Sequence, residues 1–203
     1  MKMPNRALVA AAVLAACGTS AQAATFEFGE LLSGSYEPSD IFATLSINQL
    51  SGTTFNYSLS TNDLNSLFTA GAFVGSMTND VLGYSALPTV SNISGGGVAV
   101  VEAENGGGPG GNWEFRYDFG DGSGDRLFGN ETVSWTATFS DSVTYTGDGF
   151  ALHVQGLTSL QGGSAWYTPT TPIPEPETYA MMLAGLGLLG FVARRRMKGA
   201  KRA

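Results

Sequence analysis

The stretch Trp113-Glu114-Phe115-Arg116-Tyr117-Asp118-Phe119 alternates aromatic and charged side chains with a period of two. Successive side chains of a β-strand point to opposite faces of the sheet, so this pattern predicts a strand with one buried aromatic face and one polar face. The residues that we expect in the core from this strand are Trp113, Phe115, Tyr117 and Phe119.

The same alternation recurs on both sides of this stretch. Residues 55–59, 132–139 and 150–155 place apolar side chains at every second position, and glycine-rich turns separate them. Helical spacing is confined to residues 63–74. Many short strands joined by such turns predict an all-β fold, either a β-sandwich or a jelly roll. Further strands are predicted at 25–31, 41–47, 81–87 and 98–102.

The first 23 residues have the parts of a signal peptide. Lys2 and Arg6 precede an apolar stretch, and Ala21-Gln22-Ala23 before Ala24 fits a cleavage site. We predict cleavage after Ala23, which leaves a mature chain without cysteine. The alternative is a lipoprotein box that ends at Cys17, the sole cysteine, which would then be lipidated.

The C-terminal segment carries three features in a fixed order. Pro174-Glu175-Pro176 and the acidic Glu177 come first, residues 178–193 then carry no charge, and Arg194-Arg195-Arg196 follows. As a helix, residues 176–193 would be about 27 Å long, close to the roughly 30 Å of a bilayer core. We therefore predict a transmembrane helix over 176–193. By the positive-inside rule the basic tail, 194–203, stays in the cytoplasm.

Together these features resemble the PEP-CTERM sorting signal of Gram-negative bacteria. The resemblance covers residues 172–198. It implies recognition by an exosortase, a membrane-embedded cysteine transpeptidase, and processing near Pro174, Glu175 and Pro176. The expected location follows: export through the inner membrane, anchoring by the C-terminal helix, and then the cell surface or the extracellular space after processing.

One exported domain is predicted between the two targeting segments. Its surface is strongly acidic, because residues 24–173 contain 15 acidic and two basic residues, a net charge of −13. Such a charge disfavours binding to nucleic acid. We divide the chain into a signal peptide (1–23), a β-sandwich domain (24–167), a Thr/Pro linker with the Pro-Glu-Pro motif (168–175), the membrane helix (176–193) and the tail (194–203).

A calcium site is the one cofactor that the sequence suggests. Asp121, Ser123 and Asp125 match the first half of an EF-hand loop, whose oxygen ligands suit calcium. The match then ends, because Arg126 stands where the loop needs glycine and Thr132 where it needs glutamate. No other cofactor is expected.

Catalytic chemistry finds little support in the sequence. His153 is the sole histidine, which excludes a multi-histidine metal site, and we expect it on the polar face of its strand. No Gly-x-Ser-x-Gly motif supplies a nucleophile. Trp166 and Tyr167 are the aromatic residues that we expect to be exposed. Carboxylates that a glycosidase would need are available at Glu102, Glu104, Glu114 and Glu131.

Three tripeptides match the acceptor pattern for N-glycosylation. They are Asn56-Tyr57-Ser58, Asn92-Ile93-Ser94 and Asn130-Glu131-Thr132. Such tripeptides arise often by chance, and we interpret them so.

The functional prediction is an exported protein of the cell envelope or extracellular matrix that an exosortase processes. We expect a structural or adhesive role in exopolysaccharide or biofilm, and no enzymatic activity. The expected partners are the exosortase, the inner membrane and an exopolysaccharide. The alternative is a secreted glycan-binding or glycan-cleaving domain that uses the same sorting signal.

Overall fold

Ten β-strands follow one another in the computed structural model, which describes residues 23–110, 113–120, 122, 124–170 and 185. The described residues between Ala23 and Thr170 form one compact unit. The strands are β1 (Ala23–Ser33), β2 (Ala43–Gln49), β3 (Thr54–Thr61), β4 (Phe73–Leu82), β5 (Thr89–Ser94), β6 (Val101–Asn105), β7 (Phe115–Phe119), β8 (Thr132–Thr138), β9 (Thr144–Gln155) and β10 (Ser164–Pro169). Two short helical segments, α1 (Leu64–Leu67) and a 3₁₀ turn (Ser159–Gln161), complete the described elements.

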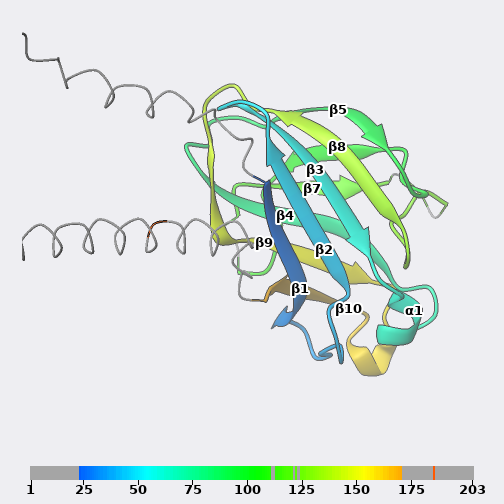
Figure 1. Ribbon diagram of the computed structural model, residues 1–203. Coiled ribbons are helices and arrows are strands. Elements are labelled where there is room, and N and C mark those ends of the chain that lie inside the picture. The colour runs from blue at the N-terminus through cyan, green and yellow to red at the C-terminus, as the bar shows by residue number, and fades with distance from the viewer. Residues whose placement is uncertain (1–22, 111–112, 121, 123, 171–184, 186–203) are drawn as a thin grey trace, which may run out of the picture. The chain divides into compact units, whose positions relative to one another are not determined.

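All ten strands belong to one antiparallel sheet. Their order is β5-β8-β3-β2-β1-β10-β9-β4-β7-β6. The two edge strands, β5 and β6, approach each other, so the sheet is nearly closed. Figure 1 shows β2 and β3 in front of β4, β7 and β9. The prediction of an all-β fold is confirmed. In place of the two sheets of a sandwich, the structure has one continuous sheet that curls around its core.

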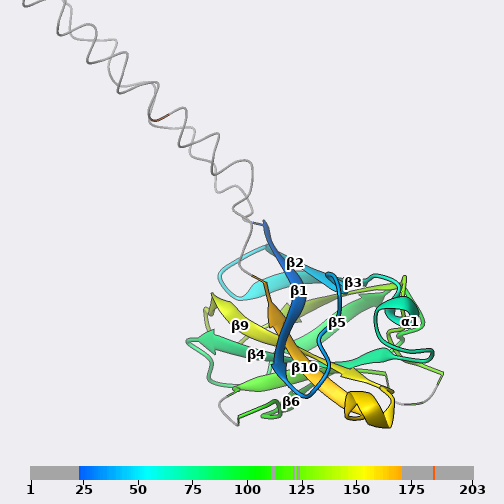
Figure 2. The same cartoon turned by 90° about the horizontal axis from the view of Figure 1, so that it is seen from below.

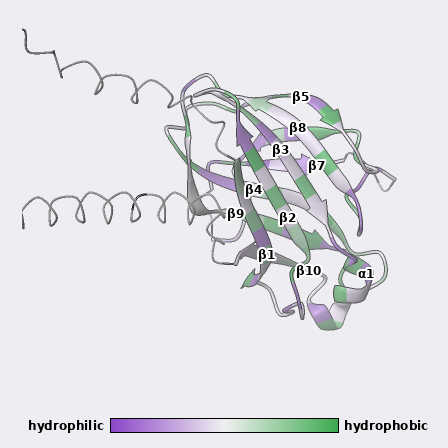
Figure 3. Cartoon of the chain, viewed as in Figure 1, coloured by the Kyte–Doolittle hydropathy of each residue, from purple (hydrophilic) through white to green (hydrophobic). Residues whose placement is uncertain are grey.

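The core is aromatic and lies inside this curled sheet. Alternate residues of the strands are apolar, as the colouring in Figure 3 shows. The ring of Trp135 stacks on Tyr57 at 4.9 Å, and Tyr117 contacts both rings edge-on. The inward residues predicted for 55–59, 132–139 and 150–155 are buried as expected.

Trp113 does not lie in the core, which corrects one prediction. Strand β7 begins at Phe115, and the half-exposed Trp113 precedes it. The Nε1 of Trp113 donates to the Pro109 carbonyl at 2.9 Å. The reason is the glycine-rich turn before it: a Cβ on Gly108 would lie 2.5 Å from the Trp113 ring and 2.8 Å from Thr78. The turn therefore packs against the outer face of β4, with Trp113 beside it.

Between residues 63 and 87 the structure differs from the predicted helix at 63–74 and the predicted strand at 81–87, because strand β4 occupies most of this segment. The predicted helix is a single turn, Leu64–Leu67, whose first amides are capped by Asp63. Residues 73–82 then form β4, and no strand covers 83–87. Ser76, Thr78 and Asn79 are all buried. A strand covered on both faces does not alternate, which is why periodicity missed it.

Strand β10 continues into the segment that we expected to be linker. It ends at Pro169, and the amide of Thr170 donates to the Glu27 carbonyl at 2.8 Å. Figure 2 shows β10 beside β1. Tyr167, which we expected to be exposed, is buried because its side chain points into the core, where its hydroxyl donates to the Tyr36 carbonyl at 2.7 Å.

Both predicted targeting segments fall outside the described residues. Ala23 and Ala24 are the first residues of β1, whereas Ala21 is not described. The motif Pro174–Pro176 and the residues Arg194–Arg196 also lie outside the described residues. Of the helix predicted over 176–193, only Gly185 is described. Within the described residues, no helix has the length and apolar character needed to cross a bilayer.

Candidate functional site

A polar groove lies on the outer face of strands β2, β3, β8 and β5. The antiparallel register aligns Ser46, Ser58, Ser134 and Ser94 in one row across the four strands. A second row begins with Asn48 opposite Asn56, which in turn pairs with Thr136. Because side chains alternate along a strand, the buried rings of Tyr57 and Trp135 point away from these rows. The rows form the floor of an open concavity of about 680 Å³.

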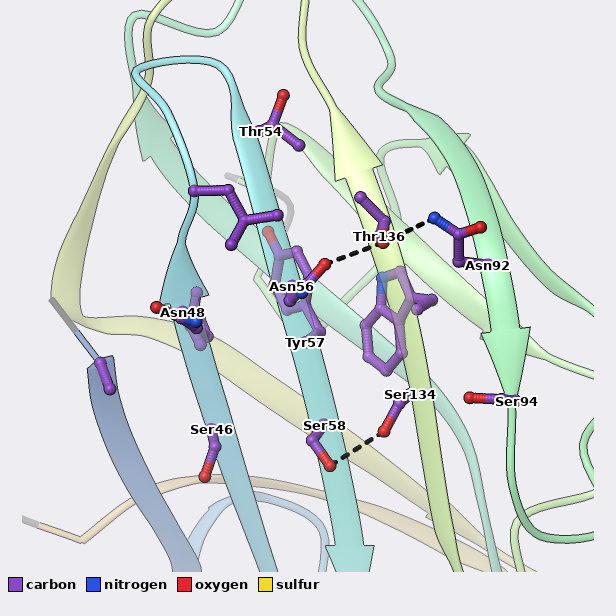
Figure 4. A pocket seen from close by; sticks show the side chains of 14 residues that line it. Ser46, Asn48, Thr54, Asn56, Tyr57, Ser58, Asn92, Ser94, Ser134 and Thr136 are labelled. Carbon is purple, nitrogen blue, oxygen red and sulfur yellow. Dashed lines mark hydrogen bonds between the residues drawn. The ribbon is translucent and has the colours of Figure 1, made fainter. Parts of the chain in front are cut away.

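Hydrogen bonds orient the side chains of the groove, as Figure 4 shows. Asn92 Nδ2 donates to Thr136 Oγ1 at 3.2 Å, and Thr136 Oγ1 donates to Asn56 Oδ1 at 2.8 Å. Next to this chain of bonds, Ser134 Oγ donates to Ser58 Oγ at 3.0 Å. Each of these bonds joins two strands, so the positions of the polar groups are set by the sheet.

A β-bulge places Asn92 in this network. The pairing of β5 with β8 shifts register between Ser91 and Ser94. Within the bulge Asn92 has a φ of 54°, in the left-handed region that asparagine tolerates better than most residues. A bulge of this kind redirects a side chain. Here it turns the Asn92 amide toward Thr136.

The groove is not apparent from the sequence alone. Ser, Thr and Asn on exposed strand positions look like ordinary solvent-facing residues, and the register that joins four strands is not visible in the sequence. A local signal was present, however. Asn56-x-Ser58 and Asn92-x-Ser94, which we interpreted as chance glycosylation patterns, place two polar side chains two residues apart on β3 and on β5.

His153 lies on the outer face of the opposite part of the sheet, as its alternation predicts. Its ring stacks on Trp166 at 4.3 Å with an interplanar angle of 2°. Its Nδ1 lies 2.9 Å from Gln155 Nε2. The register places Ser76 beside His153 and Asp118 beside Ser76. Among the described residues no hydrogen bond joins Ser76 to His153.

We expect His153 to make stability depend on pH. Burial lowers the pKa of His153, and the nearby Asp118 opposes this shift with a smaller effect. As the pH falls, His153 therefore binds a proton at a higher pH in the unfolded chain than in the folded protein. Stability from the neutral ring is complete above the ordinary pKa of about 6.5 and is lost as the pH falls below it toward the folded pKa. Urea denaturation between pH 7.5 and 5.5 should show a smaller loss of stability in His153→Gln than in the wild type. An equal loss in both proteins would contradict the assignment.

Of the four glutamates considered for glycoside hydrolysis, Glu102 and Glu104 share one face of β6, whereas Glu114 and Glu131 lie outside that strand. Glu104 forms an ion pair with Arg116, and Glu131 Oε2 accepts from the Phe128 amide at 2.8 Å. Glu102 is exposed on β6. Glu114 lies beside Asp80, and burial, followed by the contact with that second carboxyl, raises the pKa of Glu114. The structure thus brings Glu114 together with Asp80, and it also places Glu102 opposite Asp118 on the neighbouring strand.

The predicted calcium loop is described only in part. Asp121 and Ser123 lie outside the described residues. Asp125 Oδ1 accepts from the Ala99 amide at 2.6 Å, which closes the loop onto the segment before β6. In the described part of the chain no three His, Cys, Asp or Glu side chains gather as a metal-binding group. Calcium binding stays a prediction.

Comparison with protein families places the sorting signal at the C-terminus. A family model described as the PEP-CTERM protein-sorting motif matches residues 172–196. The chain carries a PEP-CTERM sorting motif. This motif supports an exported protein that an exosortase processes in a membrane-associated sorting step. Comparison of the chain with curated proteins and with solved structures finds no match.

Proposed function

We propose that the β domain is a structural or adhesive component of the cell envelope or extracellular matrix, and that it is not an enzyme. The observation that supports this proposal is the PEP-CTERM motif at residues 172–196, since it indicates export and membrane-associated sorting of the preceding domain. The domain suits that role in two respects. Its net charge of −13 over residues 24–173 favours solubility outside the cell. Its nearly closed sheet leaves few strand edges to template aggregation.

The proposed delivery has three steps. The signal peptide directs the chain through the inner membrane and is removed after Ala23. The apolar segment 176–193 then holds the domain on the outer side, while Arg194–Arg196 stay in the cytoplasm. Finally, the exosortase recognises Pro174-Glu175-Pro176 and processes the chain near it.

Replacement of Pro174-Glu175-Pro176 by three alanines should abolish processing and leave a membrane-retained precursor. The physical reason is that the enzyme loses its recognition motif while the apolar segment stays intact. Immunoblots of membrane and culture fractions from the native host, with mass spectrometry of the mature C-terminus, measure the result. The control replaces Lys198, Lys201 and Arg202 by alanine, outside the matched motif, and should process normally. An unchanged processed fraction in the Pro-Glu-Pro variant would rule out exosortase processing at this motif.

The carboxyl pair at Asp80 and Glu114 supports one alternative, a glycan-cleaving domain. The raised pKa of Glu114 suits a general acid, and Asp80 would keep it protonated; the two carboxyl groups are in contact, closer than the roughly 5 Å or more that separates the two catalytic carboxyl groups of a glycosidase. Release of reducing ends from polysaccharide by the wild type, lost in Glu114→Gln and in Asp80→Asn, would favour this alternative. If the wild type releases no reducing ends from polysaccharide, the structural role remains the proposed function.

A further inference from the structure

The groove on β2, β3, β8 and β5 differs in charge from the domain that carries it. None of its 14 lining residues has a charged side chain, and 13 of them remain when the proposed cleavage removes Ala23, although residues 24–173 carry a net charge of −13. An uncharged polar surface offers no attraction to anions or cations, and it suits a ligand that is itself uncharged and hydrogen-bonding.

The network within the groove leaves defined groups directed at solvent. Asn56 Oδ1 accepts from Thr136, so both N–H groups of the exposed Asn56 amide stay available to a ligand. Ser58 Oγ accepts from Ser134, which leaves the Ser58 hydroxyl proton available as a donor. The side chains of Ser46 and Asn48 make no hydrogen bond to any described residue. Donors and acceptors therefore alternate over a few ångströms, a pattern that matches the hydroxyl groups of a sugar chain.

The bulge at Asn92 is a second and independent observation. A residue in the left-handed region costs about 1 kcal/mol or more relative to ordinary strand geometry. The regular pairing of β5 with β8 would avoid this cost. The bulge directs the Asn92 amide to Thr136, which fixes the direction of the whole chain of hydrogen bonds. Bulges concentrate next to binding sites for this reason.

The size of the groove argues against a second copy of the chain as its occupant. Four strands about 4.8 Å apart, over about 14 Å along β3, give a floor on the order of 200 Å². A stable protein interface needs about 800 Å² from each partner. Two copies would also bring together two domains that each carry a net charge of −13 over residues 24–173. One strand of an extended polymer needs neither a large area nor an opposite charge.

We propose that this groove binds a stretch of uncharged polysaccharide. The inference rests on the proposed matrix role and names the partner for it. Asn56, Ser58 and Asn92 supply the polar contacts, and Thr136 holds Asn56 and Asn92 in position. The interaction is weak for a single domain, as expected for an open polar surface, and becomes effective when many copies decorate one matrix.

Affinity electrophoresis of the full-length protein tests this proposal. The protein is kept in a zwitterionic detergent, because a detergent with a sugar headgroup would compete. Native gels contain dextran, amylose, galactomannan or hydroxyethyl cellulose as neutral probes, and dextran sulfate as the charged one. We expect at least one neutral polymer to retard the wild type and dextran sulfate not to.

Two substitutions locate the binding site in the groove. Asn56→Asp keeps the acceptor for Thr136 but removes the amide donors and adds a charge. Thr136→Val removes the hydroxyl that orients Asn56 and Asn92. Each should weaken binding by about fivefold or more, the worth of about one hydrogen bond. The matched control is Thr132→Val on the same strand, whose hydroxyl pairs with Ser60 at 2.8 Å outside the groove, and it should bind normally.

Three outcomes would overturn the proposal. They are no retardation by any of the neutral polymers, stronger retardation by dextran sulfate, and an equal loss of binding in Thr132→Val and Thr136→Val. Slower migration that grows with protein concentration in gels without polymer would show a second copy as the occupant and would also overturn it. Polysaccharide binding is measured on purified protein, whereas processing at Pro174–Pro176 is measured in the native host. A negative binding result therefore does not affect the processing hypothesis, and each hypothesis can be rejected without the other.

Discussion

Replacement of Gly120 by alanine is expected to lower the free energy of unfolding by about 2–5 kcal/mol. Gly120 follows β7 with a φ of +80°, a conformation that favours glycine. A Cβ at this position would lie 1.4 Å from the Asp125 carbonyl oxygen. The backbone must therefore move, which strains the bond from the Gly120 amide to the Val100 carbonyl at 2.9 Å. Urea denaturation of the wild type and the variant measures the change.

Gly71→Ala is the matched control for this prediction. Gly71 has a φ of +85°, but a Cβ there would have no atom within 4 Å. Its substitution should cost about 1–2 kcal/mol, the conformational part alone. The difference between the two variants then reports the close approach to Asp125. Equal losses in both would show that the crowding at Gly120 is relieved without cost.

The strands that the sequence predicted best are those with one face in the core. Apolar and polar residues alternate in β3, β7, β8 and β9, because one face of each strand is buried and the other faces solvent. β4 lacks the contrast, since a glycine-rich turn and Trp113 cover its outer face. Its neighbours in the sheet, β9 and β7, come from distant parts of the chain. Neither the cover nor the pairing is a local property of residues 73–82, so no local pattern predicts them.

The two candidate sites also differ in whether the sequence alone predicts them. The sorting motif is linear, because a membrane enzyme recognises it in one continuous segment, and it could be identified from residues 172–196 alone. The groove is assembled from residues as far apart as Ser46 and Thr136 by strand register and by a bulge. Its members are the commonest polar residues of exposed strands. Their individual identities carry no signal, and their arrangement emerges only in the folded sheet.

Truncation of Trp135 to alanine should cost about 3–5 kcal/mol, the range for large aromatic residues in a packed core. Trp135 is 1% exposed, stacks on Tyr57 and contacts Tyr117 and Phe119 edge-on. Its removal opens a cavity where the two sides of the curled sheet meet, so the loss includes contacts on both sides. Urea denaturation followed by far-ultraviolet circular dichroism measures it. Leu160→Ala is the control, since Leu160 is 94% exposed and its truncation should change stability little.

Trp135→Phe separates packing from polarity at the same position. The Nε1 of Trp135 lies beside the Tyr117 hydroxyl, yet neither atom makes a hydrogen bond of normal geometry to a described residue. Phenylalanine keeps a ring against Tyr57 and removes the buried donor, whose desolvation is unfavourable. The phenylalanine variant should therefore lose much less stability than the alanine variant. If the phenylalanine and alanine variants lose the same stability, the indole N–H of the wild type must donate a hydrogen bond that stabilises the folded protein. A small loss in Trp135→Phe would show that ring stacking between the neighbouring strands β3 and β8, rather than a polar contact, stabilises this part of the core.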